Sequence, residues 1–240
     1  MTTISDNVQA VQERIAAAAQ RAGRSPGEVT LIGVTKTQPV ERVLETLRAG
    51  LTHFGENRVQ EALAKFAGPG QAGVEGLVPR EGITLHMIGA LQRNKARVAA
   101  RHFDYVHSVD RVELLPDLHA GARAYRDGVA LPVLVEVNLT GEESKAGVSA
   151  RELPRLVEAL SGYANLRGVG LMTVARMGSG ERELRETFAT LRALLAGLRG
   201  QYPGEWTQLS MGMTDDFEIA IEEGATMVRV GRAIFGERVR

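Results

Sequence analysis

Short apolar runs alternate with amphipathic helical segments eight times along these 240 residues, and this alternation strongly constrains the fold. One unit is Val29–Val34, an apolar and β-branched run, followed by a helical segment that Pro39 can start and Gly50 can end. Strands that alternate with helices predict a parallel sheet, and eight strands close a barrel. We therefore predict an α/β fold, a single (β/α)8 TIM barrel. The expected strands are Val29–Val34, Leu51–Gly55, Ile83–Ile88, Tyr105–Val109, Leu131–Val137, Leu166–Met172, Thr207–Met211 and Met227–Val230.

An additional helix is expected before the first strand. Apolar residues recur at helical spacing from Ile4 to Ala22, and Gly23 ends the pattern. Only ten residues follow Val230, too few for a full last helix, so we expect the N-terminal helix to cover part of the barrel. The segment 67–82, rich in glycine with two prolines, resembles a flexible insertion. Because nothing else resembles an interdomain linker, residues 1–240 are expected to form one domain.

The composition excludes several classes of function. Lysine plus arginine and aspartate plus glutamate both count 29, and this balance argues against a nucleic-acid footprint or a polybasic membrane anchor. The chain has no cysteine, which excludes disulfides, thiolate metal sites and cysteine nucleophiles. Its amino terminus lacks a signal-peptide pattern, and no apolar run approaches the length needed to span a membrane. A cytoplasmic protein is expected.

Lys36 follows the first expected strand directly. In an α/β barrel the active site lies at the carboxyl ends of the strands, so this position places an amine at the rim of a hydrophobic core. Desolvation there disfavours the charged form of a lysine, and a neutral amine is a nucleophile toward aldehydes. The simpler interpretation is that the side chain extends into water, as most surface lysines do.

Two loops after the last two strands have the features of an anion site. Ser210–Asp216 and Arg229–Gly236 each place small residues between a strand end and a helix start, where free N–H groups and the helix dipole attract anions. Gly212 and Gly231 could instead serve only tight turns, and Asp215 or Asp216 only a helix cap. Barrel closure brings these loops beside Lys36. A molecule with an aldehyde and a phosphate could therefore contact Lys36 through the aldehyde and the loops through the phosphate. Pyridoxal 5'-phosphate is the common cofactor with this pair of groups.

Three further features each allow a structural or a functional interpretation. Strand alternation places Arg229 inside the barrel, where it would either pair with a carboxylate such as Glu136 or donate to the pyridine nitrogen of the cofactor. Asn57 would either contact the cofactor or cap the next helix. His53, His86 and His107 do not form a His-x-His pair, so we expect structural histidines and no metal site.

Motifs spread over essentially the whole chain resemble those of the pyridoxal phosphate homeostasis protein family, also described as alanine racemase N-terminal-domain-like or proline synthase co-transcribed proteins. The motifs are Gly33–Lys36, His53–Asn57, His86–Lys95, Val137–Asn138 with Lys145–Gly147, Gly170–Thr173, Leu209–Asp216 and Val228–Gly236.

The resemblance implies a barrel that holds pyridoxal phosphate as a Schiff base on Lys36, with phosphate contacts from Ser210, Gly212 and Gly231 and with Arg229 at the ring nitrogen. Such proteins are thought to buffer the cofactor or deliver it to apoenzymes, without robust turnover. Arg232 stands where the family often has threonine, which leaves its phosphate contact in question. Leu85 replaces a common aromatic residue, and the segment 67–82 looks longer than usual.

Two rival functions remain. Alanine racemases share the barrel, the lysine and the arginine, but they take a second acid–base tyrosine from an additional domain across a dimer. Since no such domain follows in this sequence, we expect weak racemase activity at most, and a monomer. The other rival is a phosphosugar-processing barrel that uses Lys36 in a Schiff base without a cofactor.

Overall fold

Eight parallel strands form a closed barrel in the order β1 to β8, as the alternation predicted. The structure, a computed structural model, describes residues 3–67, 77–142 and 146–236. Strand β8 pairs with β1, with Ile32 opposite Arg229, so the two ends of the sequence pattern meet at one seam. The strands are β1 Thr30–Val34, β2 His53–Glu56, β3 Thr84–Met87, β4 Tyr105–Val109, β5 Leu131–Glu136, β6 Leu166–Met172, β7 Gln208–Ser210 and β8 Met227–Val230.

Helices surround the barrel. They are α1 Ile4–Arg21, α2 Val40–Arg48, α3 Val59–Lys65, α4 Ala96–His102, α5 Leu115–Tyr125, α6 Leu153–Ser161, α7 Glu181–Leu198, α8 Phe217–Glu222 and α9 Arg232–Phe235. Pro39 is the extended residue just before α2 rather than its first helical residue. Single 3-10 turns, Arg93–Lys95 and Val112–Leu114, precede α4 and α5.

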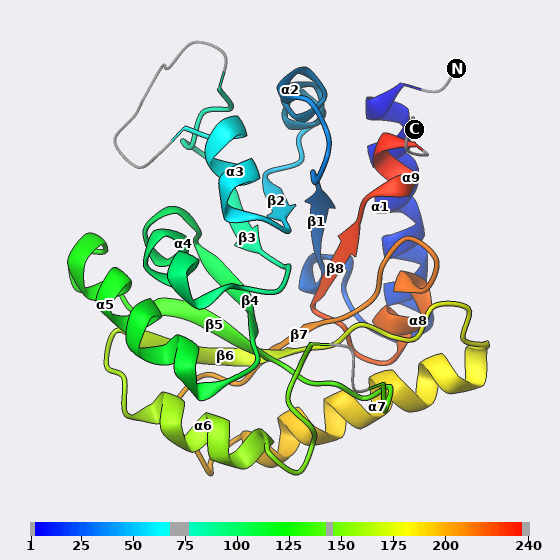
Figure 1. The fold of residues 1–240 in the computed structure, drawn as a ribbon. Helices are drawn as coiled ribbons and strands as arrows, with labels where there is room; N and C mark the ends of the chain where they lie inside the picture. Colours follow the sequence, from blue (N-terminus) through cyan, green and yellow to red (C-terminus); the bar gives the residue numbers. More distant parts are fainter. Residues whose placement is uncertain (1–2, 68–76, 143–145, 237–240) are drawn as a thin grey trace.

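The N-terminal helix covers the barrel beside the short last helix, as expected. A capping box between Thr3 and Asp6 starts α1, and its apolar face packs against α2, α8 and α9 (Figure 1). The Asn7 amide donates to the Ile234 carbonyl oxygen at 2.9 Å. Helix α1 thus shields the seam between β8 and β1. Most of the segment 67–82 that resembles an insertion lies outside the described residues.

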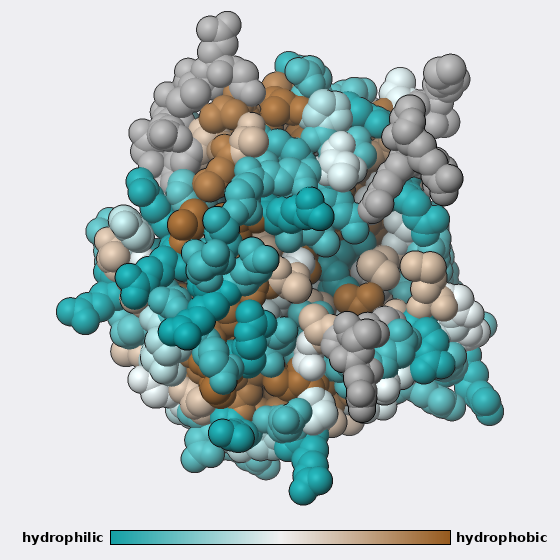
Figure 2. Space-filling model, in the orientation of Figure 1, coloured by the Kyte–Doolittle hydropathy of each residue, from teal (hydrophilic) through white to brown (hydrophobic). Residues whose placement is uncertain are grey.

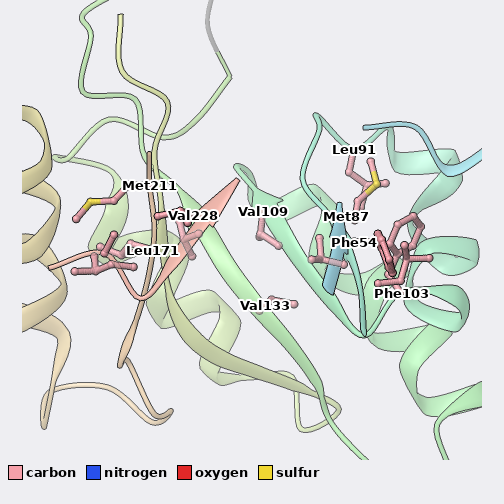
Figure 3. Packing of buried hydrophobic residues seen from close by; sticks show 14 of the residues in the cluster. Phe54, Met87, Leu91, Phe103, Val109, Val133, Leu171, Met211 and Val228 are labelled. Carbon is pink, nitrogen blue, oxygen red and sulfur yellow. The ribbon is translucent and has the colours of Figure 1, made fainter. Parts of the chain in front are cut away.

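Strand alternation separates two environments. Residues such as Val228, Leu171 and Val133 point outward and form one hydrophobic cluster with the helices (Figure 3). In that layer Phe54, Met87, Leu91 and Phe103 lie together, all 2 % exposed or less. The alternate residues point into the barrel, and many of them are polar. Burying the apolar set against the helices therefore forces Arg229 and other polar side chains toward the barrel axis.

The surface seen in Figure 2 is mostly hydrophilic, and its hydrophobic residues form small separate groups. Within the described parts of the chain, no helix has the length and apolar character needed to cross a membrane.

Candidate functional site

Lys36 lies at the carboxyl end of β1, in a turn with unusual backbone geometry. Thr35 before it is fully buried, and Lys36 itself is half-buried. Thr37 after it has a φ of 63°, the left-handed region that a β-branched residue rarely adopts. Such strain persists only where the surroundings impose it. The turn that presents Lys36 is therefore fixed by its neighbours.

A buried ion cluster fixes this turn. The Lys65 Nζ donates to the Thr35 carbonyl oxygen at 2.6 Å, and to carboxylate oxygens of Glu56 and Glu61 at 2.8 Å each. Glu61 also accepts the N–H of Thr37. The cluster thus contacts the backbone on both sides of Lys36. Sequence reasoning missed these residues, although the four-residue spacing of Glu61 and Lys65 on one helix was a signal for an ion pair.

The β7–α8 and β8–α9 loops lie beside this turn. An ideal Cβ on Gly231 would be 3.5 Å from the Val34 side chain, which places Gly231 against the end of β1. The Arg229 N–H donates to the Gly212 carbonyl oxygen at 3.0 Å and joins the two loops. Among the described residues, the N–H groups of Gly212 and Gly231 make no hydrogen bond. Arg232, by contrast, forms an ion pair with Asp215 at the surface.

Gly212 is required by both its backbone and its packing. Its φ is 90°, and an added Cβ would lie 2.6 Å from the Ala220 Cβ and 2.9 Å from the Phe217 Cα. We expect Gly212→Ala to lower the free energy of unfolding by about 2–4 kcal/mol. The matched control is Gly178→Ala, with a φ of 78° and open space, which should cost only about 1 kcal/mol. Equal urea midpoints for the two variants would contradict this account.

Arg229 is buried inside the barrel, as strand alternation predicted. Its Nη1 donates to the Ser210 Oγ at 2.6 Å, and its Nη2 donates to the Thr173 carbonyl oxygen at 2.9 Å. Among the described residues no ion pair joins Arg229 to Glu136, so that alternative was wrong, and Ser210 and Thr173 hold the guanidinium instead. Burial lowers the pKa of Arg229 to about 10, while the carboxyl groups of Glu136 and Asp216 oppose this shift. The guanidinium therefore remains charged at neutral pH.

Asn57 does not cap the following helix. Arg58 is the residue before α3, and no side chain caps that helix end. The Asn57 Oδ1 is buried without a hydrogen-bond partner, so it is available to a ligand. The β3–α4 loop packs directly against this residue, because an ideal Cβ on Gly89 would lie 2.4 Å from the Asn57 carbonyl oxygen.

Glu136, the last residue of β5, is 8 % exposed, and its Oε2 has no hydrogen-bond partner. Burial, and secondarily Asp110, raise the pKa of Glu136 to about 7, although Arg229 opposes the shift. The folded protein thus binds a proton here that the unfolded chain loses near pH 4.5. The stability contributed by this proton is complete below pH 4.5 and is lost as the pH rises to about 7.

Replacing Glu136 by glutamine should remove the cost of burying a charged carboxylate at this position at high pH. In the cofactor-free protein we expect Glu136→Gln to raise the free energy of unfolding at pH 8 by up to about 3 kcal/mol, with little change at pH 4.5. Urea denaturation at the two pH values measures the difference. A variant no more stable than the parent at pH 8 would contradict the assigned burial of a carboxylate.

The three strand histidines, expected to be scattered, form one chain inside the barrel. The His53 Nδ1 is 3.0 Å from the His86 Nε2, and the His86 Nδ1 is 2.9 Å from the His107 Nε2. The His107 Nδ1 is 2.9 Å from the Ser210 Oγ. Their spacing in sequence gave no sign of contact, because the histidines meet only when β2, β3 and β4 pair, and Ser210 comes from the distant strand β7. Among the described residues no His, Asp and Glu cluster has the arrangement of a metal site.

Comparisons with known proteins show which family the chain belongs to. The model of the family "Alanine racemase, N-terminal domain" matches residues 7–239. The pyridoxal phosphate homeostasis protein of Escherichia coli K12 is 41% identical over 238 residues, covering 99% of this chain and 98% of that protein. The protein of the same name from Pseudomonas aeruginosa is 44% identical over 239 residues, covering 99% and 97%.

A solved structure has the same fold. PipY of Synechococcus elongatus, determined with PLP bound, is 37% identical and superimposes with a TM-score of 0.77, covering 94% of this chain and 100% of that one. Matches of this extent in both sequence and fold assign the family. The chain belongs to the alanine racemase N-terminal domain family and, within it, to the pyridoxal phosphate homeostasis proteins.

Proposed function

We propose that this protein binds pyridoxal 5'-phosphate reversibly through Lys36 and serves vitamin B6 homeostasis by buffering or delivering it. The observation that carries the proposal is the convergence of Lys36, a buried charged arginine and two glycine loops at one end of the barrel. The relatives' name and the PLP-bound structure of PipY support it. An amine at one side and unpaired N–H groups at the other match a phosphorylated aldehyde.

The residues present fit the cofactor. The N–H groups of Gly212 and Gly231 suit the phosphate, and the unpaired Asn57 Oδ1 suits a polar group on the ring. Arg229 is proposed to face the ring nitrogen, with Ser210 on the phosphate side. Arg232 has the weakest support as a phosphate contact, because Asp215 already pairs with its guanidinium.

When bound, the cofactor supplies an aldehyde that condenses reversibly with an amine. The chain holds the Lys36 turn through Lys65 and Glu61, keeps a positive charge near the ring at Arg229, and offers hydrogen-bond donors in the loops. An arginine at the ring nitrogen disfavours its protonation, which weakens the ring as an electron sink. The arrangement therefore supports retention and release better than efficient carbanion chemistry.

Weak racemase activity is the alternative, but the carboxyl end of the barrel offers few acid–base groups for it. None of the four tyrosines is placed as a second acid–base group. Tyr105 begins β4 at the opposite end, Tyr125 is exposed on α5, and Tyr163 and Tyr202 pack against the outer hydrophobic cluster. Glu136, with a pKa of about 7, is a group at the carboxyl end of the barrel that is suited to carry a proton.

Two measurements test the proposal. The protein loaded with pyridoxal phosphate should restore activity to a cofactor-free PLP enzyme, as followed by the recipient's own assay. With D- or L-alanine it should show no racemisation above the rate of free pyridoxal phosphate. Turnover well above that rate, lost in Glu136→Gln, would overturn the carrier function in favour of a racemase.

We also propose that the protein acts as a monomer. The absence of one large hydrophobic patch from the face in Figure 2 supports this. Light scattering behind size-exclusion chromatography should give a mass near 25.9 kDa.

A further inference from the structure

The chain of three histidines ends on the arginine of the proposed site. From the amino end of β2 it runs through His53, His86 and His107 to Ser210, and from there to Arg229. His86, His107 and Ser210 are fully buried, and His53 is half-buried. Five strands, β2, β3, β4, β7 and β8, contribute one residue each. Nothing in the proposed chemistry accounts for these histidines.

The numbers of protons and lone pairs on these side chains fix which atom donates in each hydrogen bond of the histidine chain. Arg229 can only donate, so the Ser210 Oγ accepts its N–H, and the single hydroxyl proton of Ser210 must go to another acceptor. The acceptor in contact is the His107 Nδ1. The His107 Nε2 then carries the ring proton and donates to the His86 Nδ1, and the His86 Nε2 likewise donates to the His53 Nδ1.

This direction of donation requires that the imidazole rings of His107 and His86 are neutral. A charged His107 would present an N–H to Ser210 and leave the buried hydroxyl proton without an acceptor. Burial, together with the positive charge of Arg229, lowers the pKa of His107 to about 3. Burial also lowers the pKa of His86 well below its usual value, with smaller contributions from His107 and His53. Electrostatics and hydrogen-bond geometry thus select the same neutral state.

We propose that His107, supported by His86 and His53, is a positioning residue that orients Arg229 toward the cofactor ring by fixing the Ser210 hydroxyl. This inference rests on the proposed binding of pyridoxal phosphate. It also defines the part played by Ser210. Its hydroxyl proton is committed to His107, so Ser210 would align Arg229 and would not be the phosphate contact that the resemblance implied. The loop N–H groups would hold the phosphate. Thr173 holds the second Nη, so both ends of the guanidinium fork are fixed.

The direction of hydrogen-bond donation along the three histidines can be measured without any ligand. The protein has five histidines, so a long-range ¹H–¹⁵N spectrum of the cofactor-free, histidine-labelled protein contains few signals. We expect His53, His86 and His107 each to carry the proton on Nε2 and to have a bare Nδ1. A proton on the His107 Nδ1, or a charged ring at His86 or His107 at neutral pH, would overturn the proposal.

Two variants test the action through Arg229. His107→Leu removes the acceptor for Ser210, whereas His107→Asn offers an amide oxygen close to the place of Nδ1. His107→Leu should raise the dissociation constant for pyridoxal phosphate about tenfold, and His107→Asn should recover most of the loss. Binding of inorganic phosphate, which lacks the ring, should be unchanged in both. His119→Leu, at a histidine on α5 outside the chain, is the control.

The outcomes separate this inference from the proposed function. Equal losses of inorganic phosphate and pyridoxal phosphate binding in His107→Leu, or no recovery in His107→Asn, would overturn the positioning role. Failure of the unmodified protein to bind pyridoxal phosphate would refute the proposed function, and with it the role toward the cofactor. The positions of the protons on the three histidine rings would still establish or refute the proposed direction of hydrogen-bond donation. Urea denaturation of each variant shows whether a binding loss reflects unfolding.

Discussion

Lys36→Ala is expected to abolish the visible absorption that the protein acquires with pyridoxal phosphate, and to weaken retention of the cofactor about 100-fold, or about 3 kcal/mol. The reason is that the amine is the group proposed to bind the aldehyde, while the remaining contacts are hydrogen bonds and charge interactions. Absorption spectra after gel filtration, together with equilibrium dialysis, measure both effects.

The control is Lys95→Ala, at a lysine after β3 that lies in the 3-10 turn Arg93–Lys95. It should keep the spectrum and the affinity of the parent protein. If Lys36→Ala retained the spectrum, the anchor would be misassigned. If the unmodified protein remained colourless after reconstitution, the phosphosugar-processing alternative without a cofactor would be favoured.

Lys65→Met should lower the free energy of unfolding by about 3 kcal/mol. Glu56 is fully buried, and its Oε1 accepts from both Lys65 and Thr35. Burial already raises the pKa of Glu56 against the opposing effect of Lys65, so removing the ammonium leaves a carboxylate without compensation. Urea denaturation at neutral pH measures the loss.

The same variant should weaken cofactor binding, because Lys65 and Glu61 hold the backbone on either side of Lys36. The double variant Lys65→Met, Glu56→Gln tests the cause of the instability, since it removes the buried charge along with its partner. It should be more stable than Lys65→Met alone. If the double variant lost the sum of the two single effects, the cluster would not be a coupled unit.

The fold was predictable because its signal is periodic. Buried strands such as Leu131–Glu136 read as apolar runs, and glycine and proline mark the element boundaries. Errors concentrate at the ends, as in β2, predicted from Leu51 but beginning at His53. Leu51 packs in the outer hydrophobic cluster just before the strand, so its apolar character did not mark the strand start.

The proposed site was only partly predictable. Lys36, Arg229, Gly212 and Gly231 follow from strand ends and alternation, which are local patterns. In the cluster around Lys65, only the pair with Glu61 has a signal in the sequence, the four-residue spacing on one helix. The contacts among the histidines and Ser210 depend on side chains that meet only after the strands assemble, from residues as far apart as His107 and Ser210. Sequence spacing contains no information on such contacts.

Attachment at Lys36 is the central claim, and the chain is well suited to a direct test of it. Its lysines are Lys36, Lys65, Lys95 and Lys145, so a modified lysine can be assigned without ambiguity. The protein loaded with pyridoxal phosphate would be reduced with borohydride, digested and mapped by mass spectrometry. We predict one pyridoxyl phosphate group per chain, on the peptide that contains Lys36. Modification of Lys65, Lys95 or Lys145 with Lys36 unmodified would contradict the account.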